Sequence, residues 1–122
     1  MGVDHLKGLP VAEKMPEISD GELYMVNTLT ILPGCRTAYL EELRTVVSQA
    51  KALPGCLLLE VGERIDAPAT FVLTERWRNG LEYVNDYLTL PFYRDYLART
   101  EAMYAAPREV VVLSRRTDDT DR

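Results

Sequence analysis

Residues 54–77 read PGCLLLEVGERIDAPATFVLTERW, and this stretch decides the fold. Residues 56–65 and 70–77 are rich in the apolar, β-branched and aromatic types that strands prefer. The turn-like segment 66–68, with the sequence DAP, separates them, and a proline-glycine pair opens the stretch. We therefore expect two consecutive strands joined by a short connection.

Strand and helix patterns continue outward from this pair. Residues 22–32 alternate between two sets of side chains, which is the period of a strand. Between Pro33-Gly34 and the first strand of the pair, apolar residues recur at three- and four-residue spacings, as on an amphipathic helix. Residues 108–115, which contain three consecutive valines, are expected to form the last strand.

A second helical region follows the strand pair. Asn79 is suited to cap it, and Glu82 stands three residues later, where it can reach back in a capping box. Pro91 interrupts the pattern, because a proline inside a helix removes one backbone hydrogen bond. We expect a short helix over 81–88 and a longer one over 91–105.

The resulting order is strand, helix, strand, strand, helix, strand, the split βαβ pattern of ferredoxin-like domains. The sequence thus predicts an α+β fold, a ferredoxin-like βαββαβ sandwich, over residues 22–115. Residues 1–21 should form an N-terminal arm and residues 116–122 a polar C-terminal tail. Two helices cover one face of the sheet, yet its strands are apolar at both parities. The simplest cover for the other face is a second copy, so we expect a homodimer.

Composition and charge argue against several classes of function. The 122 residues suffice for one domain, and 47% hydrophobic with 27% charged residues is ordinary for a globular protein. A net charge of −5 disfavours nucleic acid as a partner. We find neither a stretch long enough to span a membrane nor the apolar core of a signal peptide, so the expected location is cytoplasmic.

Cys35 and Cys56 flank the first expected helix. About sixteen helical residues at ~1.5 Å each separate its ends by roughly 24 Å. A disulfide needs Cα atoms within about 7 Å, so we expect two free thiols. The sequence also lacks a Ser-His-Asp set, a CxxC pair, a glycine-rich phosphate loop and a carboxylate cluster with metal spacing, so no cofactor and no metal are expected.

Several short motifs follow one another along the chain: a PGC turn at 54–56, Glu75-Arg76-Trp77, Tyr83 and Pro91-Phe92. In this order they resemble the antibiotic biosynthesis monooxygenase family, and the likeness extends over about residues 22–115. The resemblance implies a dimeric α+β barrel. It also implies oxidation of an electron-rich aromatic or quinol substrate by O₂, without metal or flavin.

The chain departs from the family at informative positions. Many members carry a histidine nine residues after the tryptophan of ERW, where this chain has Asp86, and another just before the phenylalanine, where it has Pro91. Haem-degrading relatives use an asparagine on the first strand, which Asn27 matches, but their iron-ligating histidine falls at Tyr96. Because His5 is the only histidine in the sequence, haem degradation is disfavoured.

The expected catalytic residues are Asn27, Trp77 and Asp86. Asn27 shares the apolar face of the first strand, so its amide either holds a substrate oxygen as negative charge develops or bonds to a loop backbone. Trp77 ends the third strand and is either core or a substrate contact. Asp86 is either a base with a raised pKa or an exposed helix residue paired with Arg94.

The expected substrate-binding residues are Tyr83, Tyr96 and Arg94. Tyr83 lies on the helix that should roof the pocket. Tyr96, beyond the proline break, either donates to an oxyanion or packs in the core. Arg94 is expected to contact the substrate, although this residue type more often lies on a solvated helix face.

Three functions remain open from the sequence. The first is a cofactor-independent monooxygenase acting with O₂ on an electron-rich aromatic or quinol, polyketide-like small molecule. The second is a polyketide cyclase or isomerase that uses Asp86 or a tyrosine for proton transfer. The third is a non-catalytic small-molecule-binding dimer, which a cavity too small for a bicyclic ligand would favour.

Overall fold

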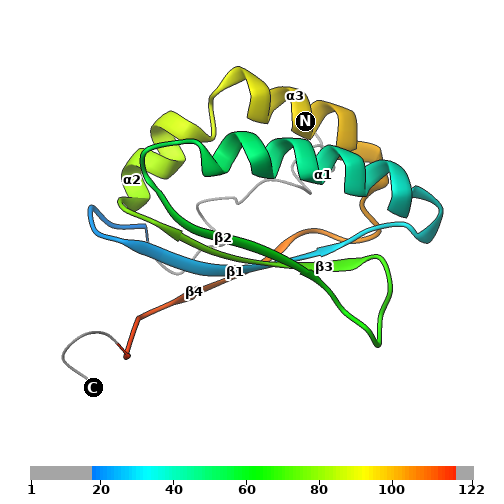
Figure 1. Cartoon of the computed structure of the whole chain (residues 1–122), viewed down its shortest axis with the longest axis horizontal. Coiled ribbons are helices and arrows are strands. Elements are labelled where there is room, and N and C mark those ends of the chain that lie inside the picture. Colours follow the sequence, from blue (N-terminus) through cyan, green and yellow to red (C-terminus); the bar gives the residue numbers. More distant parts are fainter. Residues whose placement is uncertain (1–17, 118–122) are drawn as a thin grey trace.

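The computed structural model of the chain describes residues 18–117. Most of the expected arm, 1–21, and most of the expected tail, 116–122, therefore lie outside the described residues. Within them, the elements follow the predicted order of strand, helix, strand, strand, helix, strand (Figure 1). No helix in this part of the chain is long and apolar enough to cross a membrane.

The four strands form one antiparallel sheet. They are β1 (Leu23–Thr30), β2 (Cys56–Glu63), β3 (Thr70–Trp77) and β4 (Glu109–Leu113). Their spatial order is β2-β3-β1-β4, so the first and third strands are central. This order and the helices on one face make an α+β, ferredoxin-like fold, which confirms the predicted fold class.

The β2–β3 hairpin is fastened by the carboxylate of Glu63. Its Oε2 accepts a hydrogen bond of 2.8 Å from the backbone N–H of Ala69, and Arg36 donates two bonds of 2.7 Å to its two oxygens. The Arg36 hydrogen bonds, followed by the Ala69 amide, lower the pKa of Glu63 to about 2. Ala69 has φ = 70°, a left-handed conformation that a residue with a Cβ adopts only when its surroundings hold it there.

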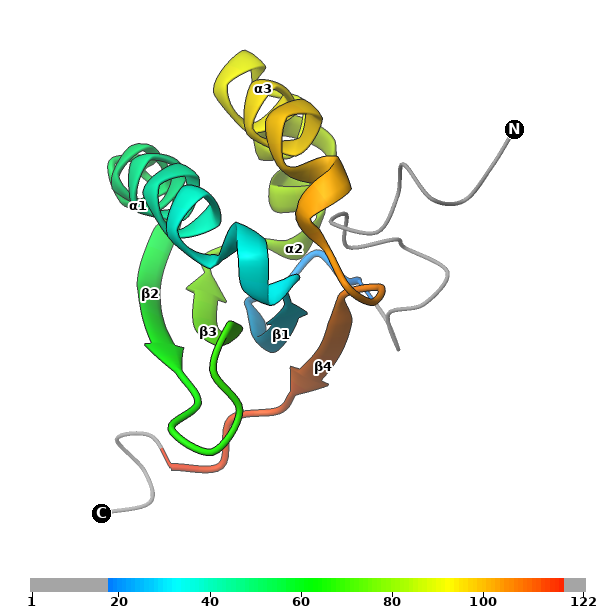
Figure 2. The ribbon, with the colours of Figure 1, turned by 90° about the vertical axis from the view of Figure 1, so that its right-hand side faces the viewer.

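Two long helices lie on the same face of the sheet (Figure 2). The first, α1 (Arg36–Lys51), follows a short 3₁₀ turn at Pro33–Cys35 and buries Tyr39, Leu43 and Val46 at helical spacing. The second, α3 (Pro91–Thr100), begins at the proline that the sequence marks as a break. It ends five residues earlier than expected, in a 3₁₀ turn over Glu101–Met103.

The expected helix over 81–88 differs in form. The structure has α2 (Gly80–Glu82) followed by one π-helical turn, η4 (Tyr83–Tyr87), in which the N–H of Leu88 bonds to the carbonyl oxygen of Tyr83. A π turn inside a helix is rare and is often found at functional sites.

The cap of α2 is half of the predicted capping box. The side chain of Asn79 accepts a hydrogen bond of 2.9 Å from the N–H of Glu82, as expected. The Glu82 carboxylate does not reach back, because Arg78 donates to it at 2.9 and 2.7 Å. The described end of the arm meets this cap, since Asn79 Nδ2 donates to the carbonyl oxygen of Asp20 at 2.7 Å.

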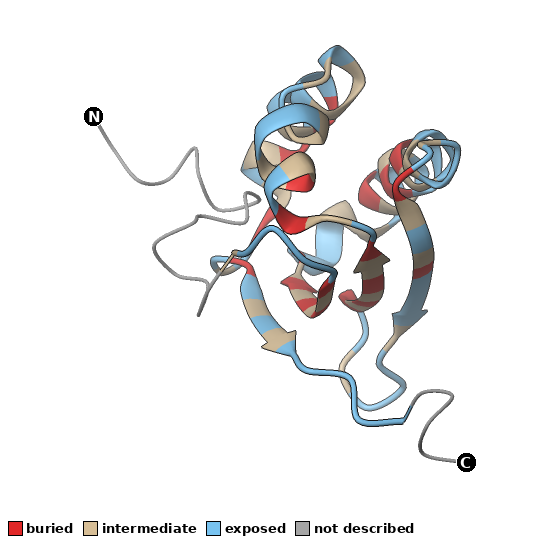
Figure 3. Ribbon diagram, turned by 90° about the vertical axis from the view of Figure 1, so that its left-hand side faces the viewer, coloured by how far each residue is buried: buried red, intermediate tan, exposed pale blue. Residues whose placement is uncertain are grey.

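The two faces of the sheet differ sharply in burial (Figure 3). Alternate residues of β1, including Met25, Asn27 and Leu29, are fully buried under the helices. On the opposite face, no element of residues 18–117 covers the sheet, and Val111 and Leu113 are 54% and 38% exposed. The prediction of a second copy depends on this open face.

Both cysteines are free thiols, as predicted. Cys35 lies just before α1 and Cys56 begins β2, so the length of α1 separates them.

Candidate functional site

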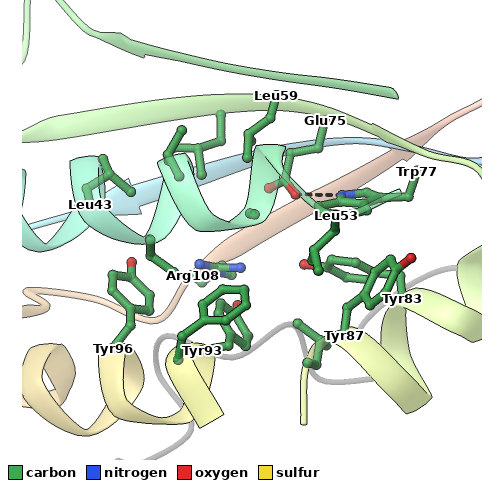
Figure 4. A pocket seen from close by; sticks show the side chains of 16 residues that line it. Leu43, Leu53, Leu59, Glu75, Trp77, Tyr83, Tyr87, Tyr93, Tyr96 and Arg108 are labelled. Carbon is green, nitrogen blue, oxygen red and sulfur yellow. Dashed lines mark hydrogen bonds between the residues drawn. The ribbon is translucent and has the colours of Figure 1, made fainter. Parts of the chain in front are cut away.

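A cavity lies between the inner face of the sheet and the helices (Figure 4). The cavity itself has a free volume of about 50 Å³. When the adjoining space that is open to solvent is included, the volume is about 490 Å³. The smaller figure is what a ligand finds without movement of the protein, because the larger one includes open solvent. Its walls come from α1, β2, β3, the π turn, α3 and the residue before β4: Leu43, Val46, Val47, Ala50, Leu53, Leu59, Leu73, Glu75, Trp77, Tyr83, Tyr87, Leu88, Phe92, Tyr93, Tyr96 and Arg108.

Glu75 is the one carboxylate among the residues that line the cavity. It stands on β3 at the inward parity and is buried. Asn27 Nδ2, from the neighbouring strand β1, donates to its Oε2 at 2.6 Å, and Trp77 Nε1 donates to its Oε1 at 2.9 Å. Each oxygen thus has one fixed N–H donor, which sets the orientation of the carboxylate.

Burial raises the pKa of Glu75 above the usual 4.5 of a glutamate. The positive charge of Arg108 and the hydrogen bonds from Trp77 and Asn27 oppose this effect but do not cancel it. A carboxylate with a raised pKa that borders a cavity is the usual form of a general base, because its proton affinity approaches that of the groups it must deprotonate.

Aromatic rings close the end of the cavity next to Glu75. The ring centroid of Trp77 lies 4.8 Å from that of Tyr83 and 5.6 Å from that of Tyr87. Tyr87 is held in place because its hydroxyl accepts a hydrogen bond of 3.1 Å from the N–H of Gly55. A Cβ at Gly55 would approach the Tyr87 ring within 2.9 Å, so glycine permits this close contact.

A group of three tyrosine hydroxyls lies at the other end. Tyr96 and Tyr39 share a hydrogen bond, and Tyr104 lies 3.1 Å from the hydroxyl of Tyr39 and 3.2 Å from that of Tyr96. Burial raises the pKa of both Tyr39 and Tyr96 well above its usual value. Both therefore stay neutral phenols, and Tyr96, which alone of the three lines the cavity, can donate a hydrogen bond to an anion there.

Arg108 brings a positive charge into the same space. It precedes β4 at the parity of Val110 and Val112, which pair with the inward-facing Asn27 and Met25. The residue is 8% exposed, and its Nε has no hydrogen-bond partner. Figure 4 shows its guanidinium group reaching between Glu75 and the rings of Tyr93 and Tyr96.

The structure brings together four of the six residues singled out from the sequence. Trp77, Tyr83 and Tyr96 line the cavity. Asn27 is fully buried behind it and contacts it through Glu75.

The other two, Asp86 and Arg94, are exposed and do not line the cavity. The hypothesis of Asp86 as a base in this cavity therefore has no geometric support, because its carboxylate lies on the solvent side of the π turn.

The site residues selected from the sequence do not include Glu75, Arg108 or Tyr93. For Glu75 a signal was available, since a carboxylate stands at the same parity as Phe71, Leu73 and Trp77. Arg108 has the parity of the apolar residues that follow it, but the burial of one arginine at the start of a strand cannot be read from a sequence.

The cavity can accept a proton at Glu75, hold negative charge at Arg108 and the neutral phenols, and exclude water by its apolar walls. Such a set fits proton abstraction from a small organic acid. Within residues 18–117, no group of three or more histidine, cysteine, aspartate or glutamate side chains could hold a metal ion.

Comparison with known proteins places these features in a family context. Residues 23–99 match the model of a family described as antibiotic biosynthesis monooxygenase. A comparison with curated proteins finds no match.

Solved structures from several bacteria share the fold. Rv0793 from Mycobacterium tuberculosis is 22% identical with a TM-score of 0.72, over 81% of this chain and 99% of that one. A protein from Nitrosomonas europaea, described as a candidate antibiotic biosynthesis monooxygenase, is 17% identical with a TM-score of 0.73, over 81% and 94% of the two chains. One from Caulobacter crescentus with the same description is 15% identical with a TM-score of 0.74, over 82% and 94%.

Proposed function

Because the chain belongs to the antibiotic biosynthesis monooxygenase family, we propose that it oxidises an electron-rich aromatic or quinol with O₂ and without a cofactor. The observation that supports this proposal is the buried Glu75 at the cavity wall, held by Asn27 and Trp77. The substrates meant are small, polyketide-like phenols, hydroquinones or anthrones, whose anions react with O₂ directly.

The proposed reaction starts with proton transfer. Glu75 accepts the proton of the substrate hydroxyl or of its acidic carbon, and the resulting anion passes one electron to O₂. The two radicals combine to form a carbon–peroxide bond, and Glu75 returns its proton to the peroxide oxygen. Cleavage of the O–O bond with loss of the remaining hydrogen on that carbon releases water and leaves the quinone carbonyl. One oxygen atom of O₂ enters the product and the other leaves as water.

The residues around Glu75 have distinct parts in this scheme. Trp77 and Tyr83 bound the site where the substrate ring would lie, and Tyr96 offers a phenol at the far end. Asn27 is a positioning residue, because its amide contacts Glu75 and not the free space. The apolar walls exclude water, which strengthens the electrostatic interactions inside the site.

The size of the cavity restricts the proposal. Pockets that bind drug-sized ligands enclose about 300–1,000 Å³, so such a ligand does not fit into the present 50 Å³ without movement of the protein. A bicyclic substrate requires α1 and α3 to separate or the half-buried rings of Phe92 and Tyr93 to turn outward. This small volume is also the observation that favours a non-catalytic small-molecule-binding dimer.

A cyclase or isomerase is the second alternative, and the buried Glu75 favours it equally, since proton transfer alone needs no oxygen.

We also propose that two copies pair through the open face of the sheet to form a dimeric α+β barrel. The apolar residues on that face support this, because Val111 and Leu113 would otherwise remain in water.

Oxygen uptake tests the proposal. A sample stripped of metals should consume O₂ when a panel of hydroquinones and anthrones is added, and labelled O₂ should place one atom in the product. Turnover that continues under strict anaerobiosis would instead identify a cyclase or isomerase. Ligand binding without any product in either atmosphere would identify a binding protein.

Two substitutions distinguish Glu75, the base proposed from the structure, from Asp86, the base expected from the sequence. Glu75→Gln should abolish most of the oxygen uptake, whereas Asp86→Asn should leave it unchanged. The opposite result would restore Asp86 as the base. Asp95→Asn, an exposed position on α3, is a matched control for the loss of one surface carboxylate.

A further inference from the structure

We propose that Arg108 and Glu75 together select ligands that are weak acids, which bind as the anion on Arg108 while Glu75 keeps the proton. This inference rests on one part of the proposed function, namely that the cavity is the site where the substrate binds. It concerns the charge of the bound ligand, and it requires no reaction with oxygen.

The first observation is that Arg108 is a buried cation without a direct ion-pair partner, although its charge acts on Glu75 from within the same cavity. The residue is only 8% exposed, its Nε lacks a hydrogen-bond partner, and it takes part in no ion pair among residues 18–117. An arginine side chain is charged at any accessible pH. Buried charges are normally paired, because removal of an ion from water is costly. Nε of the guanidinium therefore has an unused N–H, to which an anionic ligand can bind.

The second observation is that several phenols lie within electrostatic reach of Arg108. They include Tyr93, Tyr96 and Tyr83, and burial raises the pKa of each of them, so they are neutral hydrogen-bond donors. An oxyanion placed against Arg108 would thus meet a guanidinium and phenol O–H groups together. Such a set favours an oxygen anion over a neutral ligand.

The third observation is the balance of charge in the cavity. With Glu75 ionised, the free cavity holds one negative and one positive group that do not form an ion pair. A ligand that enters already ionised would leave one uncompensated negative charge in an apolar space. A neutral acid avoids this, because its O–H bond breaks, its proton goes to Glu75, and its negative charge stays beside Arg108.

The other titratable groups near Glu75 do not compete for that proton. They are Tyr83 and Tyr93 from the helical side and Cys56 from β2, and burial raises the pKa of all three. They remain protonated near neutral pH, so Glu75 is the acceptor. Phenols and enols are the class of ligand that carries one acidic hydroxyl on an apolar body.

The test uses 4-nitrophenol, a single-ring weak acid whose anion is coloured. Under anaerobic conditions and at a pH where the free probe is mostly neutral, the bound probe should show the anion spectrum. Its binding should release less than half a proton per molecule to the solution, because Glu75 takes the proton up. A bound probe with the neutral spectrum, or release of a full proton, would overturn the proposal.

Three variants separate the two charged groups. Arg108→Met should remove the anion spectrum and weaken binding by about 10- to 100-fold, the loss expected for charge-assisted hydrogen bonds. Arg108→Lys should keep the spectrum. Glu75→Gln should keep it too, but with about one proton released per molecule bound. Arg44→Met, an exposed position on α1, is the matched control.

A purely structural role for Arg108 makes a different prediction. If the arginine exists only to support the fold, Arg108→Met should lower the melting temperature and leave the spectrum of the bound probe unchanged, which would refute the proposal. We expect the melting temperature to stay equal or rise, because methionine removes an unpaired buried charge.

Failure of this inference and failure of the proposed function are distinguishable. Absence of oxygen uptake with an intact anion spectrum refutes only the monooxygenase proposal, and oxygen uptake without that spectrum refutes only the role of Arg108.

Discussion

Replacement of Glu75 by glutamine is the sharpest test of the proposed site, because the shape of the side chain is kept while its ability to accept a proton is lost. Oε1 of the glutamine can still accept from Trp77 Nε1, now at 2.9 Å. The new amide nitrogen would face Asn27 Nδ2, which now donates at 2.6 Å. Rotation of the Asn27 amide relieves this conflict, since its Oδ1 is buried without a partner and can accept instead.

The magnitudes follow from this geometry. The number of hydrogen bonds is conserved, so the free energy of unfolding should change by no more than about 1 kcal/mol. Loss of a general base lowers the rate by about 100- to 10,000-fold, which is roughly 3 to 5 kcal/mol of transition-state stabilisation at 1.36 kcal/mol per tenfold. The effect on rate thus exceeds the effect on folding, and unfolding cannot account for it.

The dependence on pH gives a second readout. The rate of the unmodified protein should fall as the pH drops through the pKa of Glu75, which lies above the usual 4.5. The glutamine variant should lack this decrease.

The contribution of Glu75 to folding stability should decrease as the pH rises, whereas its contribution to the rate increases. A carboxyl with a raised pKa stabilises the fold below the unfolded pKa and loses this contribution as the pH rises, so the variant should gain relative stability as the pH rises from about 4.5 through the pKa of Glu75. Steady-state oxygen uptake measures the rate at each pH, and thermal denaturation measures the folding stability. A glutamine variant with an unchanged rate, and with the same decrease in rate at acidic pH, would show that Glu75 is not the base.

Three further outcomes are expected. Trp77→Phe removes the donor to Oε1 of Glu75, so the pKa read from the pH profile should rise, and an unshifted profile would exclude that coupling. Glu63→Gln should lower the melting temperature at pH 7, because a carboxylate with a pKa lowered to about 2 stabilises the fold above its unfolded pKa. The same variant should lack the loss of stability that the unmodified protein shows as the pH falls from about 4.5 towards 2. Sedimentation equilibrium should give twice 13.8 kDa, and Val111→Glu on the open face should give a monomer; a monomeric unmodified protein would refute the pairing of sheet faces.

The elements of the fold were largely accessible from local patterns. The alternation in residues 22–32 predicts β1, and the Pro-Gly pairs mark both ends of the region that becomes α1. The position of Asn79 predicts the helix cap, because its hydrogen bond spans only three residues. The π turn at Tyr83–Tyr87 was not predicted, since no residue pattern distinguishes it from an ordinary helical turn.

The candidate site was accessible only in part. Trp77 and Tyr83 could be placed at the cavity from parity and helix position together with the family resemblance. Asp86 was selected because it stands where relatives carry a histidine, but position along a helix does not say which way a side chain faces. Its exposure follows from how the π turn and α3 pack on the sheet.

By itself, the sequence determined the α+β class, the order of the elements, the free thiols and the family, because each depends on residues close together in the chain or on short motifs in a fixed order along it. The tertiary structure alone decided which charged groups share the cavity. Asn27 and Glu75 are 48 positions apart, and β1 beside β3 makes them hydrogen-bonding neighbours. Arg108 joins them because β4 pairs with the other edge of β1. Such pairing depends on contacts distant in sequence, which no local pattern encodes.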